Sequence, residues 1–141
     1  MLETLSLNYN DMKKQEQALT TEFQKWLKHN WKTTGVFEVK VARDGKSFPF
    51  RELKAHQKRA LRSAGSKFVY KIPDLGYQNP FDLLMITESP GYVVIFYPRP
   101  REAKVFYMIE VSVIEEEIES GAKKIDEARA NEICFRLGVL C

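Results

Sequence analysis

The chain lacks the features of a membrane or secreted protein. It has no run of about 18 apolar residues and no basic leader followed by an apolar stretch, so the sequence predicts neither a membrane span nor a secretory signal. Its two cysteines, Cys134 and Cys141, have the spacing of neither a zinc site nor a disulfide framework. We therefore expect a protein of the cytoplasm that does not associate with membranes.

Motifs of several enzyme classes are also missing. The sequence has no Gly-rich phosphate loop, no zinc motif, and no Ser or Cys nucleophile with a suitable histidine, because His29 and His56 are its only histidines. An enzyme unrelated to nucleic acid is therefore the least expected class. What the chain does have is 44% hydrophobic and 12% aromatic residues among 141, which is enough to bury the core of a single domain over residues 1–141.

Hydrophobic spacing predicts a mixed α/β domain. Helices are expected over residues 10–29 and 50–64, strands over 35–43, 67–72, 81–87, 92–97 and 105–113, and one or two further helices over 114–137. The turn signal Ser89-Pro90-Gly91 predicts a hairpin between the strands that flank it. The sum is a mixed central sheet of about five strands, flanked by three or four helices.

Charge is distributed unevenly along the chain. The segment Lys40–Lys71 holds ten basic and two acidic residues, whereas acidic residues dominate Glu110–Glu127. Such polarity suits a protein that presents one face to a polyanion, although charged runs are also common on faces that only contact solvent. Within the predicted second helix, the residues expected to contact a nucleic-acid backbone are Lys54, Lys58, Arg59 and Arg62.

The strand over residues 35–43 has one apolar face and one face that carries only Glu38 and Lys40. Composition alone would produce Glu-x-Lys more than once, and the chain has it three times, but only this pair shares a strand face. A carboxylate beside a lysine can hold a divalent metal next to a cation that positions water or stabilises negative charge. A solvated ion pair on a half-exposed strand would give the same pattern.

Two more residues could complete a site around this pair. Asp82, in Asn79-Pro80-Phe81-Asp82, begins an apolar strand and would lie at its mouth, although Asp is also frequent in turns near Pro and Asn. Gln57 follows His56 in the basic helix, where it could orient a water or a carboxylate, although helical Gln is commonly solvated.

Together these residues resemble the PD-(D/E)XK nuclease superfamily, and more narrowly its Holliday-junction resolvase branch. The resemblance covers residues 20–65 well and 66–97 loosely, and it is carried by Glu22 in the first helix, Phe37-Glu38-Val39-Lys40, Ser47-Phe48-Pro49-Phe50 and His56-Gln57. It implies a restriction-endonuclease-like core in which strand and helix residues bind magnesium and activate water for phosphodiester cleavage.

By position, the resemblance assigns Glu38 and Lys40 to the E-x-K pair, Gln57 to the helical Gln, and Glu22 to the acid of the N-terminal helix. The chain departs from the pattern in one respect, because it has no Asp or Glu between Glu22 and Glu38, where the superfamily usually places an acidic strand residue. We expect Asp82 to replace that residue, and Asp74 is the less favoured choice.

The expected function is metal-dependent, structure-specific cleavage of branched DNA. Glu38 and Asp82 would hold Mg²⁺, for which Mn²⁺ should substitute, and Lys40 would orient water or stabilise the transition state. A four-way junction is roughly two-fold symmetric, so a homodimer is expected, with residues 92–97 and the acidic C-terminal helices as candidate interfaces. The alternatives are a nuclease with another target, as in repair or restriction, and a catalytically inactive DNA-binding relative.

Overall fold

The computed structural model describes residues 9–30, 35–64, 68–72, 83–87 and 90–140. In chain order its elements are α1 (Tyr9–His29), β1 (Val36–Val41), β2 (Ser47–Pro49), the 3₁₀ helix η1 (Phe50–Glu52), α2 (Ala55–Ala64), β3 (Phe68–Ile72), β4 (Leu83–Thr87), β5 (Gly91–Phe96), β6 (Lys104–Glu110), α3 (Val111–Glu119), β7 (Lys124–Asp126), α4 (Glu127–Ile133) and β8 (Arg136–Leu140). The mixed α/β class expected from the sequence is therefore confirmed.

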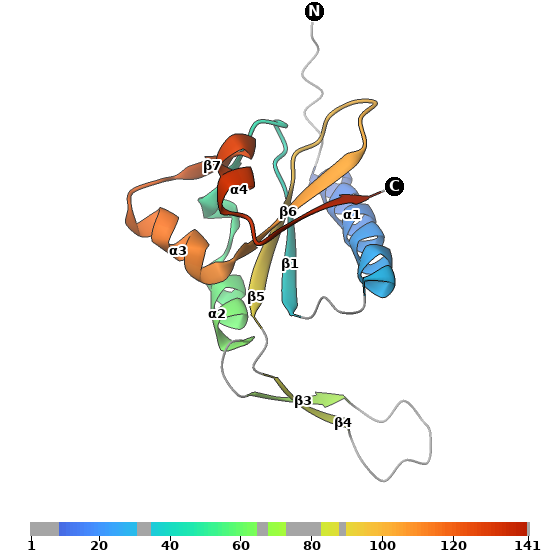
Figure 1. The fold of residues 1–141 in the computed structure, drawn as a ribbon, viewed down its shortest axis with the longest axis vertical. Coiled ribbons are helices and arrows are strands. Elements are labelled where there is room, and N and C mark those ends of the chain that lie inside the picture. The colour runs from blue at the N-terminus through green and yellow to red at the C-terminus, as the bar shows by residue number, and fades with distance from the viewer. Residues whose placement is uncertain (1–8, 31–34, 65–67, 73–82, 88–89, 141) are drawn as a thin grey trace, which may run out of the picture.

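A four-stranded mixed sheet in the order β1-β5-β6-β8 forms the centre of the fold. Strands β1 and β5 are parallel, and the other two pairings are antiparallel. Helix α1 lies on one side of this sheet, and α2, α3 and α4 lie on the other (Figure 1). The sheet has four strands rather than about five, because β3 pairs with β4, and β2 with β7, in two separate ribbons.

Helix α1 is amphipathic and covers its side of the sheet with one face. Leu19 and Phe23, four residues apart, are buried against β1, β5 and β6, whereas its Lys and Gln residues are mostly exposed. Asp11 lies in the first turn and Lys28 in the last, where the carboxylate and the ammonium each interact favourably with the helix dipole. No helix in the described ranges is both long and apolar enough to span a bilayer.

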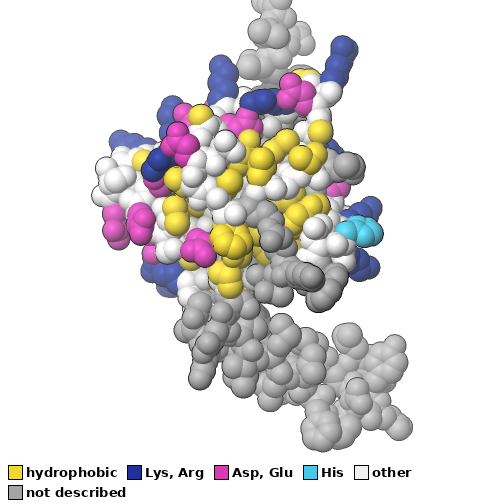
Figure 2. Space-filling view, in the orientation of Figure 1, with side chains coloured by type: hydrophobic (Ala, Val, Ile, Leu, Met, Phe, Trp, Pro, Cys, Tyr) yellow, Lys and Arg dark blue, Asp and Glu magenta, His cyan; other side chains and the backbone are white. Residues whose placement is uncertain are grey.

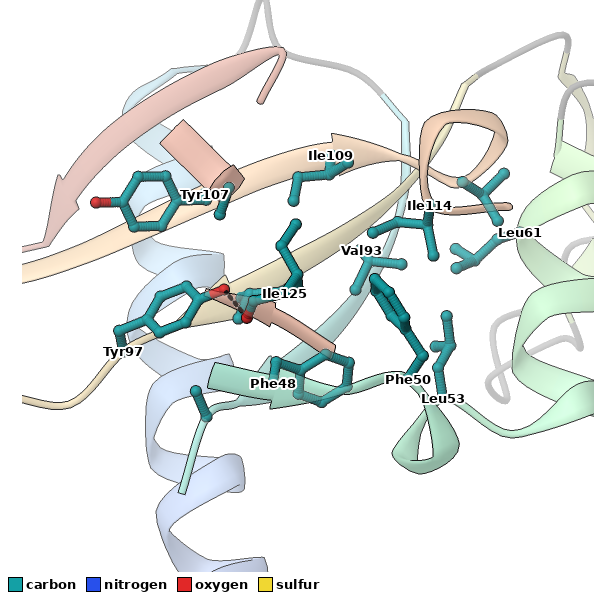
Figure 3. Packing of buried hydrophobic residues seen from close by; sticks show 14 residues of the cluster. Phe48, Phe50, Leu53, Leu61, Val93, Tyr97, Tyr107, Ile109, Ile114 and Ile125 are labelled. Atoms are coloured by element: carbon teal, nitrogen blue, oxygen red, sulfur yellow. Dashed lines mark hydrogen bonds between the residues drawn. The ribbon is translucent and has the colours of Figure 1, made fainter. Parts of the chain in front are cut away.

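Strand β5 is buried along its whole length and divides the core into two clusters. Val93 and Ile95 pack with residues of β2, η1, α2 and α3 in the cluster shown in Figure 3. Tyr92, Val94 and Phe96 point to the opposite face and pack beneath α1. Burial on both faces is typical of a strand that has a neighbour on each side.

Gly91 allows α2 to pack closely on the sheet. A Cβ atom at this position would lie 2.3 Å from the backbone oxygen of Leu61 in α2, which is too close for any side chain. Only glycine therefore allows α2 to approach β5 this closely. Leu61 is one helical turn after Gln57, so this close contact also determines how near Gln57 comes to the sheet.

The predicted hairpin across Ser89-Pro90-Gly91 is wrong. Strand β4 pairs with β3, and β5 lies between β1 and β6. A turn signal shows that the chain changes direction but does not identify the partner of the next strand. Because β5 is central and buried, residues 92–97 cannot form the dimer interface that the sequence suggested.

The segment expected to be purely helical after residue 114 also contains two strands. Helix α3 starts earlier than expected, at Val111, and the chain turns at Gly121 with a φ of 97°, where a break was predicted. Strand β7 has only three residues, and β8 forms an edge of the main sheet. Gly138 suits β8 because a Cβ there would overlap the Phe106 ring. Strands this short carry too few residues for a period of two to show.

Candidate functional site

Glu38 and Lys40 lie on the face of β1 that is turned toward α2. Their neighbours in the parallel register are Val93 and Ile95, which belong to the core cluster on that side. Phe37, Val39 and Val41 instead pack beneath α1. The alternation along β1 therefore follows the sequence prediction, and the Lys40 ammonium lies 3.5 Å from Glu38 Oε1.

Gln57 of α2 completes a cluster with this pair. Its Nε2 donates a hydrogen bond of 2.7 Å to Glu38 Oε1, and its own Oε1 accepts one of 3.0 Å from the backbone N–H of Lys54. The second bond fixes which end of the amide faces Glu38, because only the NH₂ end can donate to a carboxylate. Of the five catalytic residues predicted from the sequence, the structure thus brings three together: Glu38, Lys40 and Gln57.

Lys40 is the one charged side chain that is buried among the described residues, with 7% of its surface exposed. Glu38 retains 29% exposure of its side chain, so the carboxylate closes the cluster on the solvent side. A buried ammonium needs a charged or hydrogen-bonding partner, which Glu38 supplies. Both contacts are to Glu38 Oε1, and none of the described residues hydrogen-bonds to the second carboxylate oxygen, Oε2.

Glu22 does not join this cluster. It lies on α1, on the opposite side of the sheet, where the Lys104 ammonium donates to its Oε1 at 2.5 Å. Its second oxygen, Oε2, is buried without a hydrogen-bond partner in the described part of the chain. The resemblance assigned Glu22 from its helix alone, and the sequence could not show that this helix and α2 cover different faces.

The predicted second metal ligand, Asp82, and its alternative, Asp74, both lie outside the described residues. Within the described ranges, no group of three or more His, Cys, Asp or Glu side chains could hold a metal ion. Of the acids predicted to hold the metal, the described chain contains Glu38. Magnesium binds through one or two carboxylates and retains waters, so one further acidic residue would suffice.

The four residues predicted to contact nucleic acid differ in whether they form an ion pair with a described acidic residue. Lys54 and Arg59 are exposed and Lys58 is half-buried, and none of the three has an ion-pair partner among the described residues. Arg62 instead pairs with Glu115 of α3. The ammonium and guanidinium groups of Lys54, Lys58 and Arg59 are thus available to an anion next to Gln57, whereas Arg62 also serves to hold α2 against α3.

Sequence reasoning missed a second group of cations near the site. Arg43, Arg51, Lys58, Lys123 and Lys124 line an open hollow of about 700 Å³ between η1, α2 and the β2–β7 ribbon. The Phe50 N–H donates 2.9 Å to the Lys123 carbonyl, which ties the last two lysines to η1. Lys123 and Lys124 follow an acidic stretch of sequence, so the net charge of that region is negative and does not indicate a cationic site.

Two groups near this hollow have shifted pKa values. Hydrogen bonds from the backbone N–H groups of Ser47 and Lys46 lower the pKa of Asp44. Burial raises the pKa of Tyr97, whose hydroxyl donates 3.0 Å to the Ile125 carbonyl of β7 (Figure 3). Asp44 therefore stays ionised and shapes the turn between β1 and β2, while neutral Tyr97 anchors β7 to β5.

Comparisons with known proteins found no relative of this chain. No family model matches it, and neither a curated protein nor a solved structure matches it at the significance we required. Any proposal about the function of this chain therefore depends on its own residues and their geometry.

Proposed function

We propose that the protein is a metal-dependent endonuclease that hydrolyses phosphodiesters in branched DNA, as Holliday-junction resolvases do. The observation that carries the proposal is the buried ammonium of Lys40, which is held beside the partly exposed carboxylate of Glu38 and the amide of Gln57. Burying a lysine costs free energy, and a partner removes only part of that cost, so such groups mark functional sites more often than exposed pairs do.

Each residue of the cluster has a role in this proposal. Gln57 holds Glu38 through Oε1 and thereby directs Oε2 toward a ligand. Lys40 adds a fixed positive charge, which stabilises negative charge that develops on a phosphate. Glu38 with Asp82, or with Asp74, would hold Mg²⁺ or Mn²⁺. The chemistry such an ion supplies when bound is polarisation of the phosphate and of a water.

The DNA backbone would approach along α2. Lys54, Lys58 and Arg59 lie on the helix that also carries Gln57, or directly before it, so a phosphate near Glu38 has cations beside it. Such contacts bind any sequence and weaken steeply as salt rises. Substrate choice would then depend on the shape of the DNA.

A homodimer would suit a four-way junction, and β8 is the surface that we propose for it. It is an edge strand of the sheet, and its exposed hydrophobic side chains are Phe135, just before it, Leu137 and Val139, at 61%, 48% and 49% exposure. Hydrophobic side chains gather in a band across this face in Figure 2. An apolar edge strand can pair antiparallel with its own copy about a two-fold axis, which would extend the sheet.

Replacing Leu137 and Val139 by lysine should convert a dimer into a monomer in sedimentation equilibrium at micromolar concentration. Two lysines at the exposed Gln17 and Thr21 of α1 add the same charge and should leave the association unchanged. A wild-type chain that sediments as a monomer, alone and with junction DNA, would contradict the dimer.

An inactive DNA-binding protein is the second candidate. The specific observation in its favour is that the described residues contain no group of three or more His, Cys, Asp or Glu side chains that could hold a metal ion. The two candidates share their DNA-binding surface and differ in whether an acidic residue reaches Glu38.

Nicking of synthetic four-way, flap and linear duplex DNA, with Mg²⁺ and with EDTA, separates these candidates. Wild type should nick branched DNA only with the metal, and Glu38→Gln should remove nicking while DNA binding survives. Glu102→Gln is the matched control, because Glu102 belongs to another Glu-x-Lys sequence and pairs with Arg99 at the surface. Equal nicking by Glu38→Gln and Glu102→Gln would refute the site, and binding without nicking under any metal would favour the inactive protein.

A further inference from the structure

The hollow beside η1 gathers cations from separate parts of the chain. Arg43 follows β1, Arg51 lies on η1, and Lys58 lies on α2. Lys124 is the first residue of β7, and Lys123 directly precedes it. The hollow has a volume of about 700 Å³, within the range of ligand sites. Five positive side chains that meet there from four segments constitute a surface that the fold assembles, rather than one charged run.

Most of these cations have no acidic partner in the part of the chain that the structure describes. The two acids in the lining are already engaged, since Glu52 lies 3.7 Å from Arg43 and Asp44 accepts two backbone N–H groups. Among the described residues, no ion pair involves Arg51, Lys58, Lys123 or Lys124. By contrast, Arg62, Arg99, Lys104 and Arg129 all pair with acids elsewhere on the surface. Like charges held together without counter-charges repel one another, and an anion relieves that repulsion.

The lining favours backbone phosphates over a nucleobase. Phe50 is the one aromatic residue in the lining, and it is buried with 6% exposure, so it presents no ring face on which a base could stack. Lysine and arginine side chains without an aromatic platform are typical of contacts that position a nucleic acid without reading its sequence.

Two residues that line the hollow are close in sequence to members of the Glu38 cluster. Lys58 directly follows Gln57 in α2, and Arg43 follows Lys40 by three residues, a span of at most about 10 Å along the chain. Phosphates of one strand advance by about 3.4 Å each along a duplex axis. A strand with one phosphate at Glu38 would therefore bring another to the hollow two or three nucleotides away.

We infer that this hollow binds a second phosphate of the DNA strand whose cleavage is assigned above to Glu38 and Lys40, two or three nucleotides from the cleaved bond. The inference rests on the proposed function and adds to it a site that sets where the strand lies. The hollow thus acts in binding and positioning, whereas Glu38, Lys40 and Gln57 act at the cleaved phosphate.

The test compares a double variant with a matched control. Arg51→Ala with Lys124→Ala removes two exposed charges from the hollow, and Lys14→Ala with Lys25→Ala removes two exposed charges from α1. Junction binding is measured with Ca²⁺ in place of Mg²⁺ across a salt series. The hollow variant should bind about tenfold more weakly and reduce the salt slope by about 1 to 2, and the control should match wild type.

Junctions that carry one uncharged methylphosphonate at successive positions then locate the phosphate. Neutralising the phosphate two or three nucleotides from the cut should weaken wild type and have no further effect on the hollow variant. Equal weakening of both proteins, a hollow variant that binds like the control, or pyrophosphate binding in the hollow without any effect on DNA would overturn the inference while leaving the nuclease proposal intact. A wild-type protein that neither binds nor cuts DNA would refute both.

Discussion

The two faces of the central sheet differ in what they carry, although strand β1 contributes to both. Beneath α1, the face is built from aromatic rings, with Phe23 at 5.2 Å from Phe37 and 5.0 Å from Phe106 between ring centroids. Beneath α2, the same strand presents Glu38 and Lys40 beside Gln57. The first face can contribute little except stability, and the second includes a charge that stability alone does not require.

Each face also has one Glu–Lys pair, and their burial differs. Glu22 of α1 and Lys104 of β6 have side chains that are 31% and 49% exposed, so water screens their attraction. In the Glu38 pair the lysine side chain is 9% exposed. The comparison indicates that burial of the lysine, rather than the presence of a Glu–Lys pair, distinguishes the candidate site. Core substitutions on either face should therefore cost stability, whereas substitutions of Glu38, Lys40 and Gln57 on the α2 face should mainly cost activity.

The largest expected effect on stability comes from Phe23→Ala beneath α1. Phe23 is 1% exposed and contacts three aromatic rings, so its removal should lower the free energy of unfolding by about 3–5 kcal/mol in urea titrations. Gln17→Ala is the control, because Gln17 is exposed on the same helix and its loss should cost less than about 1 kcal/mol. Equal losses for the two variants would mean that α1 does not pack as described.

Gly91→Ala should reduce both stability and activity. The added methyl group meets Leu61 O and forces α2 away from the sheet, which should cost about 1–3 kcal/mol and separate Gln57 from Glu38. Ala60→Gly weakens the same helix by about 1 kcal/mol without touching β5. Nicking should fall in Gly91→Ala and persist in Ala60→Gly, and similar rates in both would argue against the positioning role of α2.

Gln57→Ala should lower stability modestly and reduce activity more clearly. It removes the hydrogen bonds to Glu38 and Lys54, worth about 1 kcal/mol, and frees the carboxylate to rotate. We expect about a tenfold lower nicking rate, measured under single-turnover conditions with saturating metal. Gln24→Ala, at an exposed position of α1, should have no effect on the nicking rate. If Gln57→Ala nicks at the same rate as this control, Gln57 has no role in the site.

The smallest effect concerns Asp44 and pH. Because the pKa of Asp44 is lowered in the folded chain, its contribution to stability is present above its ordinary pKa of 3.8 and is lost as pH falls below that value. Asp44 is exposed, so the contribution should be below about 0.5 kcal/mol. Urea midpoints of wild type and Asp44→Asn should differ slightly at pH 7 and converge at pH 3; a gap that widens in acid would contradict this sign.

Local patterns predicted the parts of the fold that depend on a single element. The spacing of Leu19 and Phe23 indicated α1, and the alternation along β1 placed Glu38 and Lys40 on one face. Strand partners were not predictable in the same way. Strand β5 pairs with β1, which is 55 residues earlier in the chain, and the apolar sequence of β5 does not indicate which strand it pairs with. Strand β8, with Gly138 at its centre, gave no distinguishable period.

The candidate site was likewise predictable where it depends on local sequence, but not where it depends on how distant elements pack. Its E-x-K pair and Gln57 follow from local sequence, and the structure brings them together. Which sheet face Glu22 occupies depends on helix packing, and the meeting of Lys123 with Arg51 depends on a ribbon between distant segments, so neither could be read from spacing. Asp82 lies outside the described residues, and its role stays a prediction.

Lys40→Met tests the central claim most directly, since it removes the buried charge and keeps most of the side-chain volume. If Lys40 is buried for chemistry, the free energy of unfolding should stay within about 1 kcal/mol of wild type or rise, while Mg²⁺-dependent nicking of a four-way junction falls by at least about 100-fold. A folded Lys40→Met protein that nicks the junction at the wild-type rate would contradict the account.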